Sequence, residues 1–267
     1  MEQLRISLPC QLTASPSSRL LHSLWPPLET GTLWSQAKLY WISEQQEATE
    51  GTRKPRVKVA ALSVVRRPGR GTISVGGYTY YRSGRSDGHH LQGVVIAISS
   101  RLQPSLVEVI PVNERIMVLR LKLAFSFMSL IAVYTLTNVC KLNVKEIFCT
   151  KLASVSDSCP QRDIHIVLGD FNAVSGCDRA GYEMSVGPHG SGADAISKNT
   201  LLFPDFARSQ NLRISGSWYQ RSDPHHWTWS SNAGNAAKEI DHILLSICWR
   251  ISYNYPSGPL QNFPAGQ

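Results

Sequence analysis

The stretch IHIVLGDFNA, residues 164–173, decides how the rest of the chain is interpreted. Its aliphatic residues have the length and composition of a short buried strand, and Gly169 ends the run. Asp170 and Asn172 then stand at the carboxyl end of this strand, where α/β sheets bind ligands. A carboxylate that activates water and an amide that donates to a phosphate oxygen can share one phosphate there. The alternative is an Asx turn, in which both side chains only cap the loop.

The segments around this stretch predict a sandwich of sheets with helices beside it. Strands are expected over 56–65, 73–81 (with a bend at two glycines), 91–99 and several runs of 106–136, and helices over 33–47, 143–155 and 199–210. Asn143 and Glu146 have the spacing of a capping box, and Pro204 inside the third helix costs about 3 kcal/mol. The buried side of the second helix is expected to carry Val144, Ile147, Phe148, Leu152 and Val155.

The domain organisation follows from length and punctuation. The 267 residues suffice for one large α/β domain, expected over 31–250. Residues 1–30, rich in Ser, Pro and Leu, are expected to be a disordered leader, and residues 251–267 an irregular tail. The loop 174–197 is long and rich in glycine, which more often indicates function or disorder than packing.

The charge of the chain favours a polyanionic partner. The net charge is +8, and nine basic residues lie between Arg53 and Arg85 with no acidic residue among them. Such a run is either a solvated basic face or a surface that follows phosphates. The six cysteines form no CxxC pair, and no apolar run reaches the length of a membrane span. We therefore expect an intracellular protein without a membrane segment, for which a nuclear location would suit a DNA partner.

Four segments occur together in an order typical of one superfamily. They are ISVGGYTYYRSGRSDGHHLQGVVIAIS at 73–99, VYTLT at 133–137, GDFN at 169–172 and TWSSNAGNAAKEIDHILL at 228–245. Together they resemble the endonuclease/exonuclease/phosphatase superfamily, and within it the endonuclease domains of non-long-terminal-repeat retrotransposons and the craniofacial development protein-like sequences derived from them. The resemblance implies an α/β fold of the α+β type, a four-layered sandwich of two mostly antiparallel sheets flanked by helices.

The same resemblance assigns roles to site residues. Asp170 resembles the aspartate that activates the attacking water and binds the metal, Asn172 the amide that steadies the phosphate, and Tyr134 the tyrosine that approaches it. Asp241 resembles the aspartate that orients a catalytic histidine. The implied cofactor is Mg²⁺ or Mn²⁺, and the implied partner is DNA or RNA, with no obligate protein partner. We expect Trp229 to contact the nucleic acid, Trp227 being the more core-like of the two neighbouring tryptophans. Arg70 and Arg85 are candidates for phosphate contacts, with solvated loop residues as the equal alternative.

The sequence departs from the family's pattern at the metal and the base. Val64 stands where the resemblance places the metal-ligand glutamate, and Glu29 is the only substitute we identify. After Asp241 there is no acidic residue and after His242 no histidine, so we expect the family's terminal Asp-His and last strand to be absent. Losing one positioned acid or base costs about 10²- to 10⁴-fold in rate. We therefore expect an endonuclease-like domain with impaired catalysis.

Three other interpretations remain open at this point. The chain can be a nucleic-acid-binding module that does not cut, or a retroelement remnant without activity. Phosphoinositide and sphingomyelin phosphatases share the fold, but the sequence motifs at 73–99 and 181–220 resemble the retroelement branch more. The pairs His89–His90 and His225–His226 do not predict zinc, since adjacent side chains on a strand point to opposite faces.

Overall fold

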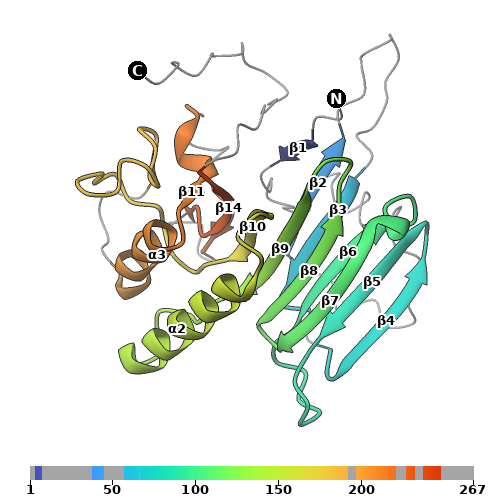
Figure 1. Ribbon diagram of the computed structural model, residues 1–267. Helices are drawn as coiled ribbons and strands as arrows, with labels where there is room; N and C mark the ends of the chain where they lie inside the picture. The colour runs from blue at the N-terminus through green and yellow to red at the C-terminus, as the bar shows by residue number, and fades with distance from the viewer. Residues whose placement is uncertain are drawn as a thin grey trace.

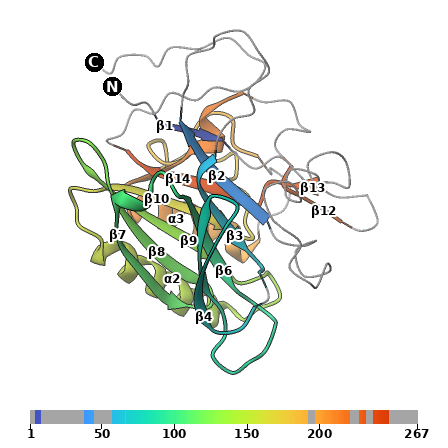
Figure 2. The same cartoon turned by 90° about the vertical axis from the view of Figure 1, so that its right-hand side faces the viewer.

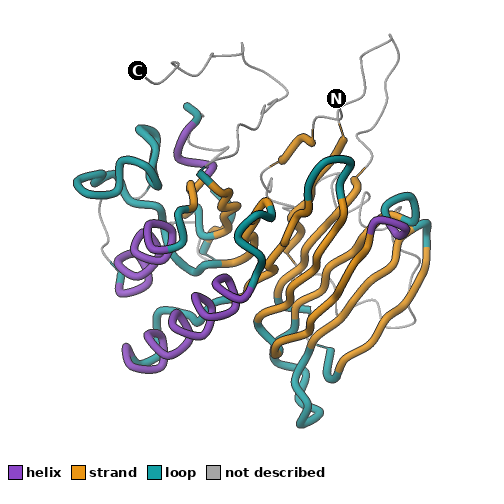
Figure 3. The backbone as a smooth tube through the Cα atoms, in the orientation of Figure 1, coloured by secondary structure: helices purple, strands orange, loops and turns teal. Residues whose placement is uncertain are grey.

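The computed structural model describes residues 4–7, 38–44, 57–65, 67–191, 197–220, 227–231 and 237–247. These residues form two six-stranded sheets, a two-stranded ribbon and the helices α2 (Leu142–Ser158) and α3 (Lys198–Ser209). The sheets lie face to face, and both helices cover the outer face of the second sheet (Figure 1; Figure 3). The predicted α/β sandwich of two mostly antiparallel sheets is confirmed.

The first sheet is antiparallel throughout and has the order β1-β2-β3-β6-β5-β4. Its strands are β1 (Leu4–Ser7), β2 (Lys38–Glu44), β3 (Val57–Ser63), β4 (Arg70–Val75), β5 (Tyr78–Ser83) and β6 (Val94–Ser99). A short 3₁₀ turn, η1 (Gln103–Ser105), follows β6 and leads into the second sheet.

The second sheet has the order β11-β14-β10-β9-β8-β7. Its strands are β7 (Leu106–Asn113), β8 (Ile116–Lys122), β9 (Phe127–Tyr134), β10 (Ile164–Asp170), β11 (Leu212–Ile214) and β14 (Asp241–Ser246). Only the β9–β10 pair is parallel, because α2 carries the chain back to the starting edge between these two strands. The 3₁₀ helix η2 (Ser215–Trp218) follows β11, and β12 (Trp229–Ser230) with β13 (Ala237–Lys238) forms the separate ribbon visible in Figure 2.

One core fills the space between the two sheets. Alternate residues of β8, β9, β10 and β14 face it, opposite β3 and β6 of the first sheet. A second core lies between the outer face of the second sheet and the two helices, where Leu152 of α2 and Phe203 and Phe206 of α3 are buried. In the part of the chain that the structure describes, no helix is long and apolar enough to cross a membrane.

Residues 38–44 correct one prediction, because the expected helix over 33–47 is replaced there by strand β2. The segment Tyr40, Trp41, Ile42 is aromatic and β-branched, a composition that favours a strand once a neighbour is available to pair with. That neighbour is β3, with Leu39 opposite Leu62. Strand β1, which lies within the expected leader, pairs in turn with β2.

The double glycine at 76–77 corrects a second prediction. The expected single strand over 73–81 is a hairpin, in which Val75 pairs with Tyr78 across a two-residue turn. Both glycines have positive φ, 61° and 79°, which is the conformation that a two-residue hairpin of this kind requires. A bend was expected where the chain reverses completely.

Helix α2 is correctly located, but its start and its buried side differ from the prediction. It begins at Leu142 after Lys141, and no side chain caps it, so the expected Asn143–Glu146 capping box does not form. Leu152 and Val155 are buried and Phe148 packs against the same core, as predicted. Val144 and Ile147 are instead 44% and 68% exposed, and Lys145 is buried, so the prediction is wrong for the first turns of the helix only.

The described part of the expected loop 174–197, residues 174–191, is closely packed at two of its glycines, while a functional role for it stays a prediction. A side chain at residue 187 or 190 would clash with backbone oxygens, since a Cβ there would lie 2.3 Å from the Ser217 oxygen or 1.9 Å from the Gly176 oxygen. Helix α3 follows as predicted and includes Pro204, with the Ser197 hydroxyl accepting from the Thr200 amide at its start. Residues 251–267, Glu29 and the pair His225–His226 lie outside the described residues.

Candidate active site

Three of the predicted site residues stand in one row across the second sheet. Asp170, the last residue of β10, pairs with Tyr134 of β9 on one side and with Asp241 of β14 on the other. Each is two residues from an inward-facing core residue of its own strand, so all three are directed toward the space between the sheets. Both carboxylates are buried, with Asp170 3% and Asp241 1% exposed. We refer to Tyr134, Asp170 and Asp241 as the row.

Gly169 allows the parallel strands to approach each other beside the row. Its φ is 151°, and a Cβ at this position would lie 1.8 Å from the carbonyl oxygen of Val133. Since backbone cannot yield by that much, only glycine permits Asp170 to pair with Tyr134 here. The sequence indicated this glycine as the end of a strand, whereas it lies within the pairing register.

The turn after Asp170 has the geometry of an Asx turn. The amide of Asn172 donates to Oδ1 of Asp170 at 2.9 Å, and Asn172 itself has a left-handed backbone with φ 48°. Its side-chain Nδ2 donates to the carbonyl oxygen of Thr135 at 3.3 Å. In this geometry the Asn172 amide joins the ends of β10 and β9, and one oxygen of Asp170 accepts from the backbone.

Helix α3 holds this turn through a side chain of its first turn. Nδ2 of Asn199 donates to the carbonyl oxygens of Leu136, at 2.8 Å, and Asn172, at 2.9 Å. One helical turn further, the ring of Phe203 lies 4.6 Å from the rings of both Phe171 and His242. The sequence analysis did not identify Asn199, whose only signal was its position just after a helix start.

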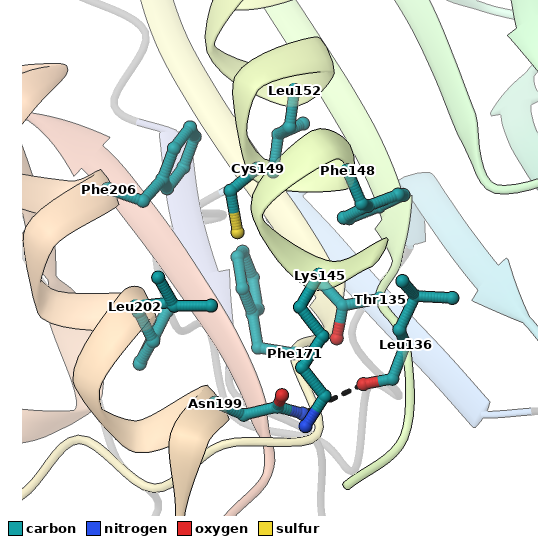
Figure 4. Close-up of a pocket in the computed structure, with 11 residues that line it drawn as sticks. Thr135, Leu136, Lys145, Phe148, Cys149, Leu152, Phe171, Asn199, Leu202 and Phe206 are labelled. Atoms are coloured by element: carbon teal, nitrogen blue, oxygen red, sulfur yellow. Dashed lines mark hydrogen bonds between the residues drawn. The ribbon is translucent and has the colours of Figure 1, made fainter. Parts of the chain in front are cut away.

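A small pocket lies between α2 and α3, next to the Asp170–Asn172 turn (Figure 4). Its volume is about 30 Å³, so it has room for water but not for a nucleotide. The side chain of Lys145 enters it from α2, and its Nζ donates to the carbonyl oxygen of Asn138 at 3.3 Å. The lining is otherwise mostly apolar and includes Phe148, Leu202 and Phe206.

The two tryptophans lie beside Asp241. The Thr228 hydroxyl accepts hydrogen bonds from the amides of Ile240, at 3.0 Å, and Asp241, at 3.1 Å. On either side of it Trp227 is 42% and Trp229 39% exposed. Of the two, Trp227 was expected to be core-like, but its exposure contradicts that expectation.

Val64 lies at the same end of the molecule as the row. It follows β3, and the next residue, Val65, donates to the carbonyl oxygen of Gly93 just before β6. At this end of the first sheet the Ser83 hydroxyl donates to the carbonyl oxygen of Asn113 in the second sheet, at 2.7 Å. Val64 also has φ 60°, a left-handed conformation that is rare for a β-branched residue.

The described residues do not provide a complete metal-binding set. No group of three or more His, Cys, Asp or Glu side chains is arranged to hold a metal ion in this part of the chain. Hard cations such as Mg²⁺ require several oxygen ligands, and the valine at position 64 supplies none. The side chains that the structure places here therefore do not fit the implied Mg²⁺ or Mn²⁺, and we derive no step through a metal.

The two predicted arginine contacts differ in their surroundings. Arg70 is exposed at the start of β4, where it pairs with Ser83 at the end of the sheet that carries Val64. Arg85 instead forms an ion pair with Asp87, whose pKa is lowered mainly by this hydrogen bond. Arg85 would have to exchange this partner to bind a phosphate.

Arg115 extends the row by one strand and was missed by the sequence analysis. The amide of Tyr134 donates to the carbonyl oxygen of Arg115 at 2.9 Å, and Ile116 pairs with Val133. Arg115 lies in the turn between β7 and β8, and its guanidinium carbon is 4.8 Å from the centre of the Tyr134 ring. The residue falls outside the basic run of 53–85, so charge clustering did not reveal it.

Comparison with known proteins supports the fold assignment. No protein-family model matches the chain. Over 196 residues, or 73% of the chain, it is 22% identical to craniofacial development protein 2 of Tragulus javanicus and 21% identical to that of Bos taurus. The matched part is 33% and 32% of those proteins, so the chain spans about a third of their length.

Solved structures give the same result. The AP endonuclease LMAP from Leishmania major has a TM-score of 0.50 at 12% identity, covering 71% of this chain and 70% of that one. The catalytic domain of Xenopus laevis APE2 has a TM-score of 0.50 at 14% identity, covering 71% and 74%. The endonuclease domain of the telomere-specific non-LTR retrotransposon TRAS1 has a TM-score of 0.43 at 16% identity, covering 64% and 67%. LMAP and the APE2 catalytic domain thus share the fold of this chain, the fold expected from the resemblance to the endonuclease/exonuclease/phosphatase superfamily.

Proposed function

We propose that this chain binds nucleic acid at the row and cleaves phosphodiester bonds poorly or not at all. The observation that carries the proposal is the pairing of Tyr134, Asp170 and Asp241 across three adjacent strands, with Val64 at the same end of the molecule. In this proposal the row supplies the side chains that meet a phosphate, while an aliphatic residue, Val64, stands where the resemblance places the metal-ligand carboxylate. Binding and turnover therefore separate in this chain.

Each residue has a distinct part in the proposed site. Tyr134 and Asn172 donate hydrogen bonds to phosphate oxygens, and Asp170 orients a water against the phosphorus. Asp241 lies on the neighbouring strand beside Asp170, at the position that would orient a proton-transfer group. The valine in place of the metal-ligand glutamate supplies no oxygen to a divalent cation, and we expect this to lower turnover.

The nucleic acid is held by contacts around the row. Exposed Trp229 stacks on an unpaired base, with Trp227 beside it, and Arg70 meets the backbone at the first sheet. Arg85 contributes where it exchanges Asp87 for a phosphate. The net charge of +8 favours the same partner. We propose DNA as the main ligand, because the fold neighbours are endonucleases, including AP endonucleases, and RNA as a second one.

The test is binding of a fluorescein-labelled oligonucleotide in EDTA, followed by fluorescence anisotropy across a salt series. We expect binding that weakens steeply with salt and is reduced several-fold by Trp229→Ala, because base stacking contributes about 1–3 kcal/mol. Trp227 is also exposed at this site, so the Trp227→Ala variant is measured in the same assay. Absence of salt-dependent binding by a protein that melts cooperatively would exclude this function and favour an inactive remnant.

A further inference from the structure

The turn between β7 and β8 fixes Arg115 at the edge of the row. Oδ1 of Asn113 accepts hydrogen bonds from the backbone amides of Arg115 and Ile116, both at 2.8 Å. The Asn113 carbonyl in turn accepts from Ser83 of the first sheet. Hydrogen bonds thus connect the backbone of Arg115 to both sheets, at the end of the molecule where the row lies.

The guanidinium of Arg115 also has protein partners. Nη1 donates to the carbonyl oxygens of Tyr134, at 3.2 Å, and Thr135, at 3.1 Å. The cation also lies against the Tyr134 ring, a geometry that attracts it to the face of the aromatic system. A long side chain that is already ordered loses little further entropy when it binds a ligand.

The remaining donors of Arg115 are available to a ligand. Among the described residues, Arg115 forms no ion pair, whereas Arg85, Arg120 and Arg208 each bind an aspartate. Nε and Nη2 of Arg115 form no hydrogen bond to the described protein, and neither belongs to the buried atoms that lack a partner. Their hydrogens therefore reach solvent beside Tyr134.

A positive group is needed at this place. Asp170 and Asp241 are buried carboxylates on adjacent strands, and both would repel a phosphodiester that approached the row. In a related site with its full set of carboxylate ligands a divalent cation offsets such repulsion. Because Val64 supplies no metal ligand, the charge that counters this repulsion has to come from a side chain of the protein.

We propose that Arg115 contacts a backbone phosphate of the bound nucleic acid, so that the row binds phosphodiesters without a divalent metal. The inference rests on the proposed nucleic-acid binding and adds the group that makes it metal-independent. A planar guanidinium with Nε and Nη2 directed to solvent suits two phosphate oxygens at once. Tyr134, held against the same guanidinium, then donates from the adjacent strand.

The experiment compares Arg115→Gln with Arg101→Gln in EDTA. Arg101 is a matched control, because it is exposed and follows β6 at the end opposite to Val94, which pairs with Ser83. Both variants lose one charge. For a duplex oligonucleotide we expect Arg115→Gln to reduce the slope of log K against log salt by about 0.9, the value for one phosphate contact, and Arg101→Gln to leave it unchanged.

A second measurement uses the unmodified protein and does not depend on how the variant folds. Phenylglyoxal modifies accessible arginines, and the modified sites are read by peptide mass spectrometry. We expect the oligonucleotide to protect Arg115 several-fold and Arg101 not at all. Equal modification of Arg115 with and without bound oligonucleotide, or a wild-type slope in a folded Arg115→Gln variant, would overturn the inference. If the wild-type protein shows no salt-dependent binding, the proposed function fails first and this inference with it.

Discussion

Replacing Asn199 with alanine tests whether α3 sets the geometry of the site. Two hydrogen bonds are lost, from Nδ2 to the carbonyl oxygens of Leu136 and Asn172. Each contributes about 0.5–1.5 kcal/mol. Because Asn199 is only 7% exposed, water cannot fully replace it at the two carbonyls. We expect the free energy of unfolding to fall by about 2 kcal/mol, which for a domain of this size lowers Tm by roughly 4–8 °C.

The consequence for the site is the sharper part of this prediction. Asn172 keeps its left-handed backbone through contacts with Asp170, Thr135 and Asn199, and the variant removes one of the three. Amide hydrogen exchange at Asn172 should accelerate by a larger factor than exchange in the strands of the first sheet. Local loosening of this kind would also weaken oligonucleotide binding several-fold.

The control is Gln210→Ala at the other end of the same helix. Gln210 also donates through a side-chain amide, to Asp157 at 3.2 Å, but this hydrogen bond is exposed. We expect its loss to cost less than about 0.5 kcal/mol. The two variants are compared by urea denaturation and by hydrogen exchange. If Asn199→Ala were no less stable than Gln210→Ala, or if hydrogen exchange at Asn172 were unchanged, the Asn199 side chain would not hold the turn.

Three further predictions concern single residues. Asp163 accepts from Arg120, at 2.6 and 3.0 Å, and from Ser129, at 2.7 Å. Burial raises its pKa, but these hydrogen bonds outweigh burial and hold the pKa below its usual value. The stability from this group is therefore present above about pH 4 and is lost as the pH falls through the folded-state pKa. Asp163→Asn should lower the free energy of unfolding by about 2–3 kcal/mol at neutral pH. The free energy of unfolding of the variant, measured by urea denaturation, should then fall less steeply at acid pH than that of the wild type. Val64→Gly relieves a left-handed valine, a strain of about 1–2 kcal/mol offset by about 0.5–1 kcal/mol of backbone entropy, so thermal melts should show a Tm that is unchanged or slightly raised; a marked fall would contradict the strain. Gly169→Ala places a Cβ 1.8 Å from the Val133 oxygen, so it should destabilise the protein by more than about 3 kcal/mol and abolish oligonucleotide binding in anisotropy assays, and near wild-type behaviour would refute the close approach of β9 and β10.

The part of the fold that the sequence predicted is the part with strong local patterns. The strand 164–168 and the helix after residue 141 have clear periodicity, and their places were correct. The failures occurred where tertiary contact decides. Segment 38–44 has a weak helical pattern, but pairing with β3 makes it a strand. Burial in the first turns of α2 depends on where the second sheet lies, which leaves Ile147 exposed and Lys145 buried.

The candidate site divides in the same way. Asp170 was predicted from its place at the end of a buried strand, and Tyr134 and Asp241 from the family resemblance; the structure pairs the three residues. Arg115 and Asn199 belong to the same site only through contacts between distant segments, so neither charge clusters nor local motifs identify them. Arg85 forms an ion pair with Asp87, two residues away, which counting basic residues over 53–85 could not reveal. The roles of these residues in binding stay predictions.

The measurement that tests the central proposal most directly is nicking of supercoiled plasmid, with Mg²⁺ or Mn²⁺, by the wild-type protein and Asp170→Ala after both have shown a cooperative melt. We predict that the wild-type protein binds the plasmid but nicks it no faster than Asp170→Ala does. Nicking by the wild-type protein that disappears in Asp170→Ala would contradict the account, because it would mean that the site cleaves with Val64 in place.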